Sequence, residues 1–124
     1  MPLTVNIDKK NVECVTLSPS GSIDTNTSII LDKAVDSVLQ LKPKVIVLDM
    51  KDVDYMSSAG VRVIIKAKKG IEALGGILTI VNLQPQIKKV FDIINALPSL
   101  QIFGSIQELD DYLTLMQKKD LGQE

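Results

Sequence analysis

The sequence predicts an α/β fold: one domain with a mixed, mainly parallel β-sheet flanked by about four helices. Segments rich in β-branched residues alternate along the chain with segments whose apolar residues recur every three or four positions. Strands and helices that alternate in this way build parallel sheets through right-handed crossovers. The length of 124 residues and the hydrophobic content of 45% suit one ordinary core, so a second domain is not expected.

The N-terminal part predicts a β-hairpin followed by a helix. Two runs of β-forming residues flank DKKN (8–11), which is typical of a hairpin and would give the sheet an antiparallel edge. SPSGS (18–22) has the composition of a loop. From Thr25 the apolar residues follow a helical period for about four turns, and Asp24 or Thr25 is suited to cap the start of this helix.

The middle of the chain predicts a buried strand and a second helix. Residues 45–48 form a compact β-branched run, as expected of a strand buried on both faces, and KDVDYM (51–56) then reads as a loop. The next segment, 57–76, has a helical pattern that stops at the Gly75–Gly76 pair. Its expected core-facing stripe consists of Val61, Ile64, Ile65, Lys68, Ile71 and Leu74.

The C-terminal part predicts two further strands, each followed or preceded by a helix. We expect a strand at 77–83, a helix at 84–97, a short strand at 100–103 and a last helix at 105–119 that a Ser105–Glu108 capping box begins. The predicted order is therefore β-β-α-β-α-β-α-β-α. The domain is expected to span residues 1–118, with 119–124 as a frayed tail.

Composition excludes several classes of function. A net charge of −1 and an aromatic content of 3% argue against nucleic-acid binding. The absence of histidine removes Ser-His-Asp and Cys-His catalysis, and with a single cysteine the usual zinc sites are lost as well. No apolar run reaches the roughly eighteen residues of a membrane span. We therefore expect a cytoplasmic protein that has no metal, no cofactor of its own and no membrane contact.

The candidate site is YMSSAG (55–60), where two adjacent hydroxyls begin a helix just beyond a strand. In parallel sheets, functional residues gather at the ends of strands in this way. One serine suffices to cap the helix, so the second is unexplained. Serine catalysis is disfavoured because Met56 replaces the first glycine of a nucleophile elbow, and because Lys66 and Lys68 lie two or more turns away along the helix. Acceptance of a phosphoryl group fits better, since a helix N-terminus attracts an incoming dianion.

Three carboxylates precede this segment at Asp49, Asp52 and Asp54. Their spacing would allow a metal site. We interpret them instead as a solvated acidic loop.

The stretch VIVLDMKDVDYMSSAGVRVII (45–65) resembles the signature of STAS domains, in particular the bacterial anti-sigma factor antagonists, also called anti-anti-sigma factors. The likeness extends to an early turn at Gly21–Asp24, to Gly75–Pro85 and to Ile87–Phe91, in the family's order. It covers essentially the whole chain. The fold that the resemblance implies is a single STAS-like domain.

The resemblance also implies a function without catalysis. In that family a cognate anti-sigma factor, which is also a serine kinase, supplies ATP and phosphorylates a serine of the antagonist. The unphosphorylated antagonist binds the kinase and frees the sigma factor, and a metal-dependent serine phosphatase resets the switch. The family motif places the acceptor at Ser58, with Ser57 as the second candidate because many members carry Asp there. The residues expected to bind the partner are Asp24, Thr25, Tyr55, Met56, Ser57, Ala59, Gly60 and Arg62.

Two other functions remain open from the sequence. A STAS subunit can act as a scaffold in a transport or signalling assembly without being phosphorylated. From a different class, Ser58 could serve a small serine hydrolase.

Overall fold

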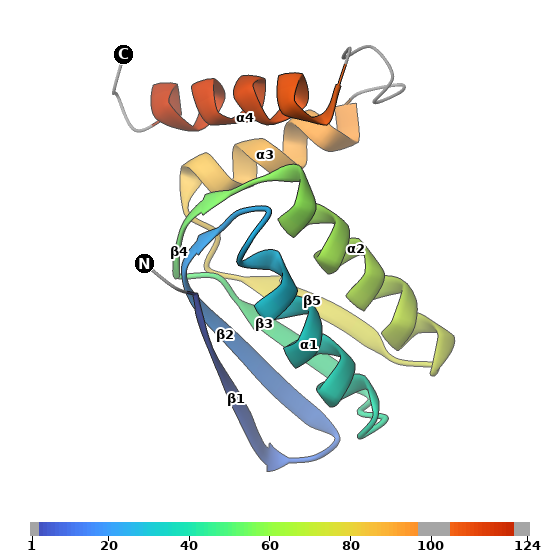
Figure 1. The fold of residues 1–124 in the computed structure, drawn as a ribbon. Helices are drawn as coiled ribbons and strands as arrows, with labels where there is room; N and C mark the ends of the chain where they lie inside the picture. The colour runs from blue at the N-terminus through green and yellow to red at the C-terminus, as the bar shows by residue number, and fades with distance from the viewer. Residues whose placement is uncertain (1–2, 97–104, 121–124) are drawn as a thin grey trace.

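The computed structural model describes residues 3–96 and 105–120, and this part of the chain confirms the α/β class (Figure 1). Its elements are β1 (Thr4–Asn11), β2 (Cys14–Ile23), α1 (Ser28–Leu39), β3 (Val45–Asp49), β4 (Asp52–Met56), α2 (Ser58–Ala73), β5 (Ile77–Val81), α3 (Pro85–Ala96) and α4 (Ile106–Asp120). The order within the described residues is thus β-β-α-β-β-α-β-α-α. It differs from the predicted order by the additional strand β4, while the predicted strand at 100–103 lies outside the described residues.

The sheet is mixed and mainly parallel, as predicted. Its strands lie in the order β1-β2-β3-β5, with β1 antiparallel to β2 and the β2–β3 and β3–β5 pairs parallel. The first half of β2 pairs with β3 and its second half pairs in parallel with β4. Strands β3 and β4 therefore follow one another along the same edge of β2.

Two details of the N-terminal hairpin were predicted wrongly. The turn lies at residues 12–13, and DKKN belongs to β1. SPSGS is not a loop but part of β2, because Ser18 pairs with Asn6 of β1 and Ser20 pairs with Asp52 of β4. Partners on both sides of β2 override the local preference of Ser, Pro and Gly for a turn.

The predicted loop KDVDYM contains strand β4, which is a further correction. The ladder between β2 and β4 shifts register, so that Gly21 pairs with Val53 while Ser22 pairs with Tyr55. Asp54 is the extra residue, and Gly21 has a φ of 122°, which glycine adopts without strain. Because of this bulge, Val53 and Met56 are both buried although they are three residues apart.

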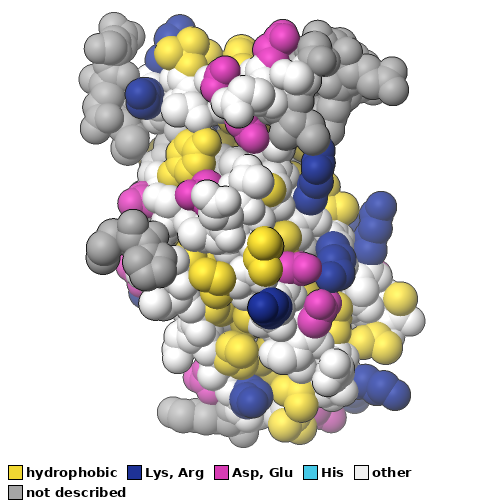
Figure 2. All heavy atoms as spheres, viewed as in Figure 1, with side chains coloured by type: hydrophobic (Ala, Val, Ile, Leu, Met, Phe, Trp, Pro, Cys, Tyr) yellow, Lys and Arg dark blue, Asp and Glu magenta, His cyan; other side chains and the backbone are white. Residues whose placement is uncertain are grey.

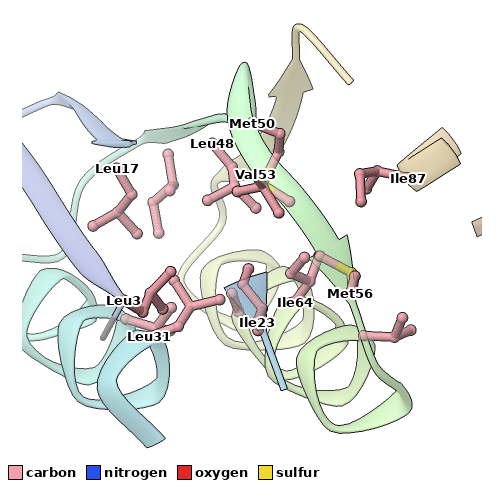
Figure 3. Close-up of a cluster of buried hydrophobic side chains, with 14 of the residues drawn as sticks. Leu3, Leu17, Ile23, Leu31, Leu48, Met50, Val53, Met56, Ile64 and Ile87 are labelled. Carbon is pink, nitrogen blue, oxygen red and sulfur yellow. The ribbon is translucent and has the colours of Figure 1, made fainter. Parts of the chain in front are cut away.

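The core lies between one face of the sheet and helices α1 and α2 (Figure 1). In β3, Ile46 and Leu48 are buried whereas Val45 and Val47 are half-buried, so this strand is less enclosed than the sequence predicted. Helices α3 and α4 pack on each other at the end of the sheet that β4 reaches. Figure 3 shows Ile23, Met56 and Ile64 near one another in the buried cluster where α2 begins.

The predicted helices form, with changes at their ends and faces. Helix α1 begins at Ser28 rather than at Thr25, and α4 continues to Asp120, two residues into the segment predicted as a tail. The remaining tail, 121–124, lies outside the described residues. Gly75, with a φ of 80°, follows the C-terminal end of α2, as the glycine pair predicted.

The predicted stripe of α2 is only partly correct. Its apolar residues that are buried are Val61, Ile64, Ala67 and Ile71. Ile65 and Leu74 are exposed, and Lys68 points outward to an ion pair with Glu72. The small side chain of Ala67 occupies the position on the stripe that the sequence analysis gave to Lys68.

In the part of the chain that the structure covers, no helix has the length and the apolar character needed to cross a bilayer.

Candidate functional site

Ser57 and Ser58 lie at the junction between β4 and α2. Ser57 is the N-cap residue of α2, with extended backbone angles, and Ser58 is the first residue of the helix. The backbone N–H of Ser57 donates to the carbonyl oxygen of Ile23 at 2.8 Å. The serines therefore follow a strand end, as predicted, although that strand is β4 rather than β3. They are also tied to the end of β2.

Neither serine hydroxyl caps the helix. Ser57 is 2% exposed and Ser58 is 4% exposed, and among the described residues neither Oγ atom has a hydrogen-bond partner. A serine therefore occupies the N-cap position, as predicted, but its hydroxyl does not accept the hydrogen bond from a backbone N–H of the helix that a capping serine usually accepts. Burying a hydroxyl without a partner typically costs about 1–3 kcal/mol. Two such groups side by side indicate that this junction is not arranged for stability alone.

A carboxylate from α4 takes the capping role. The backbone N–H of Ser58 donates to Asp110 Oδ1 at 2.8 Å. The first turn of α2 contains no acidic residue of its own, so Asp110 supplies the negative charge at the positive end of the helix dipole. A residue 52 positions away in the chain therefore caps the helix that carries the candidate acceptor.

Further contacts hold α4 across the end of β4. Gln117 Oε1 accepts a hydrogen bond from the Met56 N–H at 3.0 Å, and Gln117 Nε2 donates to the Met56 carbonyl at 2.9 Å. The Tyr55 and Thr114 hydroxyls are 2.9 Å apart and share a hydrogen bond. Gln117 is buried, and its side chain satisfies both backbone groups of Met56.

The sequence analysis missed Asp110, Thr114 and Gln117. These three share one face of α4 with the buried Leu113, because their spacings of three, four and seven residues follow the helical period. The signal in the sequence was this row of polar residues at helical spacing beside a leucine of the core. Ser105 does begin this helix as predicted, since its Oγ accepts a hydrogen bond from the Glu108 N–H at 3.1 Å.

Asp24 organises the loop beside the serines. Its Oδ1 atom accepts hydrogen bonds from the N–H groups of Asn26 and Thr27, each at 2.8 Å, and from the Thr27 hydroxyl at 3.2 Å. These bonds, above all the one from the Thr27 N–H, hold the pKa of Asp24 below its usual value. Asp24 was predicted to cap α1. It caps the turn formed by residues 25–27 instead, which immediately precedes the first residue of α1, Ser28.

We expect Asp24→Ala to lower the free energy of unfolding by about 1 kcal/mol at neutral pH, because the turn loses its acceptor. The folded-state pKa lies below the unfolded-state value of about 3.9, so the contribution of the carboxylate is complete above that value and is lost as pH falls through the folded-state pKa. Urea titrations of the wild type and of Asp24→Ala between pH 7 and pH 3 should therefore give free energies of unfolding that converge as the pH falls. Asp92→Ala, on the exposed side of α3, is the control. A constant gap across this range would contradict the role of the charge.

The other predicted contact residues differ in accessibility. Thr25 and Arg62 are exposed, and Tyr55 and Ala59 are half-buried. Met56 and Gly60 are buried. A Cβ atom on Gly60 would lie 2.7 Å from Ile23 Cγ2, so the glycine allows α2 to pack closely against the end of β2.

The three carboxylates predicted to form an acidic loop belong to strands instead, Asp49 to β3 and Asp52 and Asp54 to β4, and two of them are hydrogen-bonded within the protein. Asp49 accepts hydrogen bonds from Asn82 Nδ2 at 3.1 Å and from Lys51 Nζ at 3.0 Å, and its pKa is lowered mainly by the bond from Asn82. Asp54 accepts one from the Ser22 hydroxyl at 2.7 Å. Within residues 3–96 and 105–120, no three side chains of metal-binding type are grouped as a metal site would require.

Lys66, a candidate base for serine chemistry, is engaged elsewhere. Lys66 Nζ forms ion pairs with Asp32 at 2.8 Å and Asp36 at 3.0 Å, both on α1. The hydrogen bond to Asp32 is the main reason that its pKa is raised, which favours the protonated form and opposes a role as general base. On the face seen in Figure 2, basic side chains are interspersed with acidic and apolar ones.

Comparisons with known proteins agree on one family. The model of the STAS domain family matches residues 6–109. The protein named "Putative anti-sigma factor antagonist BtrV" of Bordetella bronchiseptica is 29% identical over 94 residues, which cover 75% of this chain and 78% of that protein.

Solved structures have the same fold. An anti-sigma factor antagonist from Mycobacterium paratuberculosis superposes with a TM-score of 0.68 at 20% identity, covering 80% of this chain and 88% of the other. The antagonist SpoIIAA in its unphosphorylated form has a TM-score of 0.62 at 20% identity, covering 73% and 83% of the two chains. The phosphorylated form of Bacillus SpoIIAA has a TM-score of 0.60 at 22% identity, with the same coverage.

Proposed function

The chain belongs to the STAS domain family, and we propose that it is an anti-sigma factor antagonist that phosphorylation of Ser58 switches off. In its unphosphorylated form it binds a cognate anti-sigma factor that is also a serine kinase, and so releases the sigma factor. The observation that carries this proposal is the pair of unbonded, adjacent serine hydroxyls at the N-terminus of α2. Relatives named as anti-sigma factor antagonists, one of them solved in both phosphorylation states, support it.

The proposed reaction takes place on the partner, and this chain is its substrate rather than its catalyst. The kinase holds ATP, the bond between the γ-phosphorus and the bridging oxygen of ADP breaks, and a new bond forms from phosphorus to Ser58 Oγ. The hydroxyl proton passes to a base on the kinase. The N-terminus of α2 favours the resulting dianion through its backbone N–H groups and the helix dipole.

The surface proposed to meet the partner surrounds Ser58. Arg62 and Thr25 are exposed on it, while Tyr55 and Ala59 are partly accessible. Asp24 orders the loop on one side. The buried members of the set, Met56, Ser57 and Gly60, shape this surface from beneath. A metal-dependent serine phosphatase would reverse the modification, and the switch is proposed to operate in the cytoplasm.

We expect incubation with the cognate kinase, ATP and magnesium to add one phosphoryl group to Ser58. Mass spectrometry of Ser57→Ala and Ser58→Ala separates the two candidates, and each variant is the matched control of the other. The expected result is full modification of Ser57→Ala and none of Ser58→Ala. The reverse pattern would show that the acceptor is Ser57. Full modification of both variants would refute both assignments.

A further inference from the structure

Helix α4 lies against the proposed phosphoacceptor. Ser58 is only 4% exposed, its backbone N–H is bonded to Asp110 of α4, and the neighbouring Met56 backbone is bonded to Gln117 of the same helix. A kinase must bring the γ-phosphorus of ATP into contact with Ser58 Oγ. It cannot do so while the hydroxyl is enclosed in this way, so the described conformation is closed toward a partner.

We propose that α4 is an internal lid, and that a partner reaches Ser58 only after α4 has moved away. Opening would replace the polar bonds of α4 to the site with bonds to water, and it would also expose Leu109 and Leu113 of α4, which belong to the buried core. Asp110 and Gln117 bond to backbone groups, and Thr114 bonds to the Tyr55 hydroxyl. Each lost bond has a small net effect on stability because water compensates for it.

The lid and the phosphoserine exclude each other. A phosphate on Ser58 Oγ carries nearly two negative charges, and it would adjoin the N–H that now binds the Asp110 carboxylate. Two anions at one helix N-terminus repel each other, and the enclosed position of Ser58 leaves no room for the added group. Phosphorylation is thus expected to keep α4 displaced. The physiological meaning of the lid rests on the proposed function, but its existence does not.

A thiol probe tests the lid without any kinase. The exposed Cys14 is replaced by serine, and Ser58→Cys then places a thiol at the acceptor position, where its alkylation by iodoacetamide reports access. A Ser37→Cys protein in the same background, with its thiol on the exposed side of α1, gives the rate for an open position. We expect Cys introduced at 58 to react at least about tenfold more slowly than Cys introduced at 37, since reaction requires opening.

Substitutions in α4 then test whether its bonds to the site control access to position 58. Asp110→Ala is expected to accelerate alkylation at position 58 by about fivefold to thirtyfold, the range that loss of a helix cap implies. Asp111→Ala is the control, because Asp111 is exposed and accepts a hydrogen bond from Gln107 of its own helix. Gln117→Ala, which removes the bonds to the Met56 backbone, should act like Asp110→Ala. Thermal unfolding verifies that each variant is folded.

Two outcomes would overturn the lid. Alkylation as fast at position 58 as at position 37 would show that α4 does not shield the acceptor. Equal rates in Asp110→Ala, Gln117→Ala and Asp111→Ala would show that the bonds to Ser58 and Met56 do not hold it in place. Failure of any kinase to modify Ser58 in a protein whose thiol probe opens as expected would refute the proposed function and leave the lid standing.

The displacement by phosphate has its own test. Phosphoserine can be installed at position 58 during synthesis, with phosphoserine at the exposed position 37 as the control, and amide hydrogen exchange followed by mass spectrometry. We expect exchange in α4 to rise at least about tenfold only with phosphoserine at 58, while β3 stays protected. Unchanged protection of α4 would refute the displacement. Equal loss in β3 and α4 would refute it too, because the modification would then unfold the whole domain.

Discussion

Ser58→Asp is expected to bind the cognate kinase about a hundredfold more weakly than Ser58→Asn, or weaker still. The two side chains have the same shape and differ by one charge. On binding, that charge must be removed from water against a surface suited to a neutral hydroxyl, which can cost several kcal/mol, and about 1.4 kcal/mol is a factor of ten in affinity. Phosphoserine, with its greater charge, should act in the same direction more strongly.

The asparagine variant is the necessary control because position 58 is enclosed. Either side chain perturbs α4 by its size, so comparison with the wild type alone would mix this effect with that of charge. Any additional release of α4 by repulsion between the new carboxylate and Asp110 would favour partner binding, so the measured ratio is a lower bound. Calorimetric titration of both variants decides the point, and equal affinities would refute an electrostatic switch.

Opposite effects on stability are expected from one chemical change at two positions of α2. Gly60→Ala should lower the free energy of unfolding by about 2 kcal/mol, because the new methyl group would lie 2.7 Å from Ile23 Cγ2 and 3.1 Å from Met56 Cγ in a filled core. Gly70→Ala meets only the end of the half-buried Leu39 side chain, at 2.8 Å, which can rotate. Removing a glycine from the helix interior should then stabilise by up to about 1 kcal/mol.

Urea denaturation of the two variants measures this difference directly. A similar gain in both would mean that the contact between Gly60 and Ile23 is loose, and that the N-terminus of α2 is not held against the end of β2. A loss of stability in Gly60→Ala alone would show that close packing of Gly60 on Ile23 fixes the position of Ser57 and Ser58 relative to the end of β2.

Local patterns predicted most of the fold. The helical period of α1 and α2, the β-branched run of β3 and the glycines after α2 depend on neighbouring residues. Each of these elements formed, although α1 begins three residues later than the pattern indicated. The family match over residues 6–109 confirms the resemblance to STAS domains that the motifs indicated. The strand predicted at 100–103 stays a prediction.

Long-range pairing explains what the sequence analysis got wrong. Strand β4 looked like a loop because the bulge at Asp54 breaks the alternation between Val53 and Met56, and its partner strand is more than thirty residues away. SPSGS looked like a loop because serine, proline and glycine favour turns. Its strand conformation comes from pairing with both β1 and β4, which no local pattern records.

The candidate site likewise has a part that local sequence predicts and a part that depends on long-range contacts. Ser57 and Ser58 were placed at a helix start because strand, serines and helix are contiguous in sequence. The contacts of α4 with the site depend on residues 52 or more positions away from the serines. The apolar period that predicts helix α4 does not indicate that Asp110, Thr114 and Gln117 share a face with Leu113 and bind the end of β4. Polar residues on a buried helix face were therefore the overlooked indication of the lid.

The central proposal is a partner switch at Ser58, and affinity capture with two forms of the protein tests it most directly. The unmodified protein and the protein with phosphoserine at 58 are immobilised side by side and exposed to an extract of the source cells, and the retained proteins are identified by mass spectrometry. We expect that the unmodified form retains a protein with an ATP-binding serine kinase fold and that the phosphorylated form does not. Retention of the same proteins by both forms, or of transport or signalling subunits without a kinase, would contradict it.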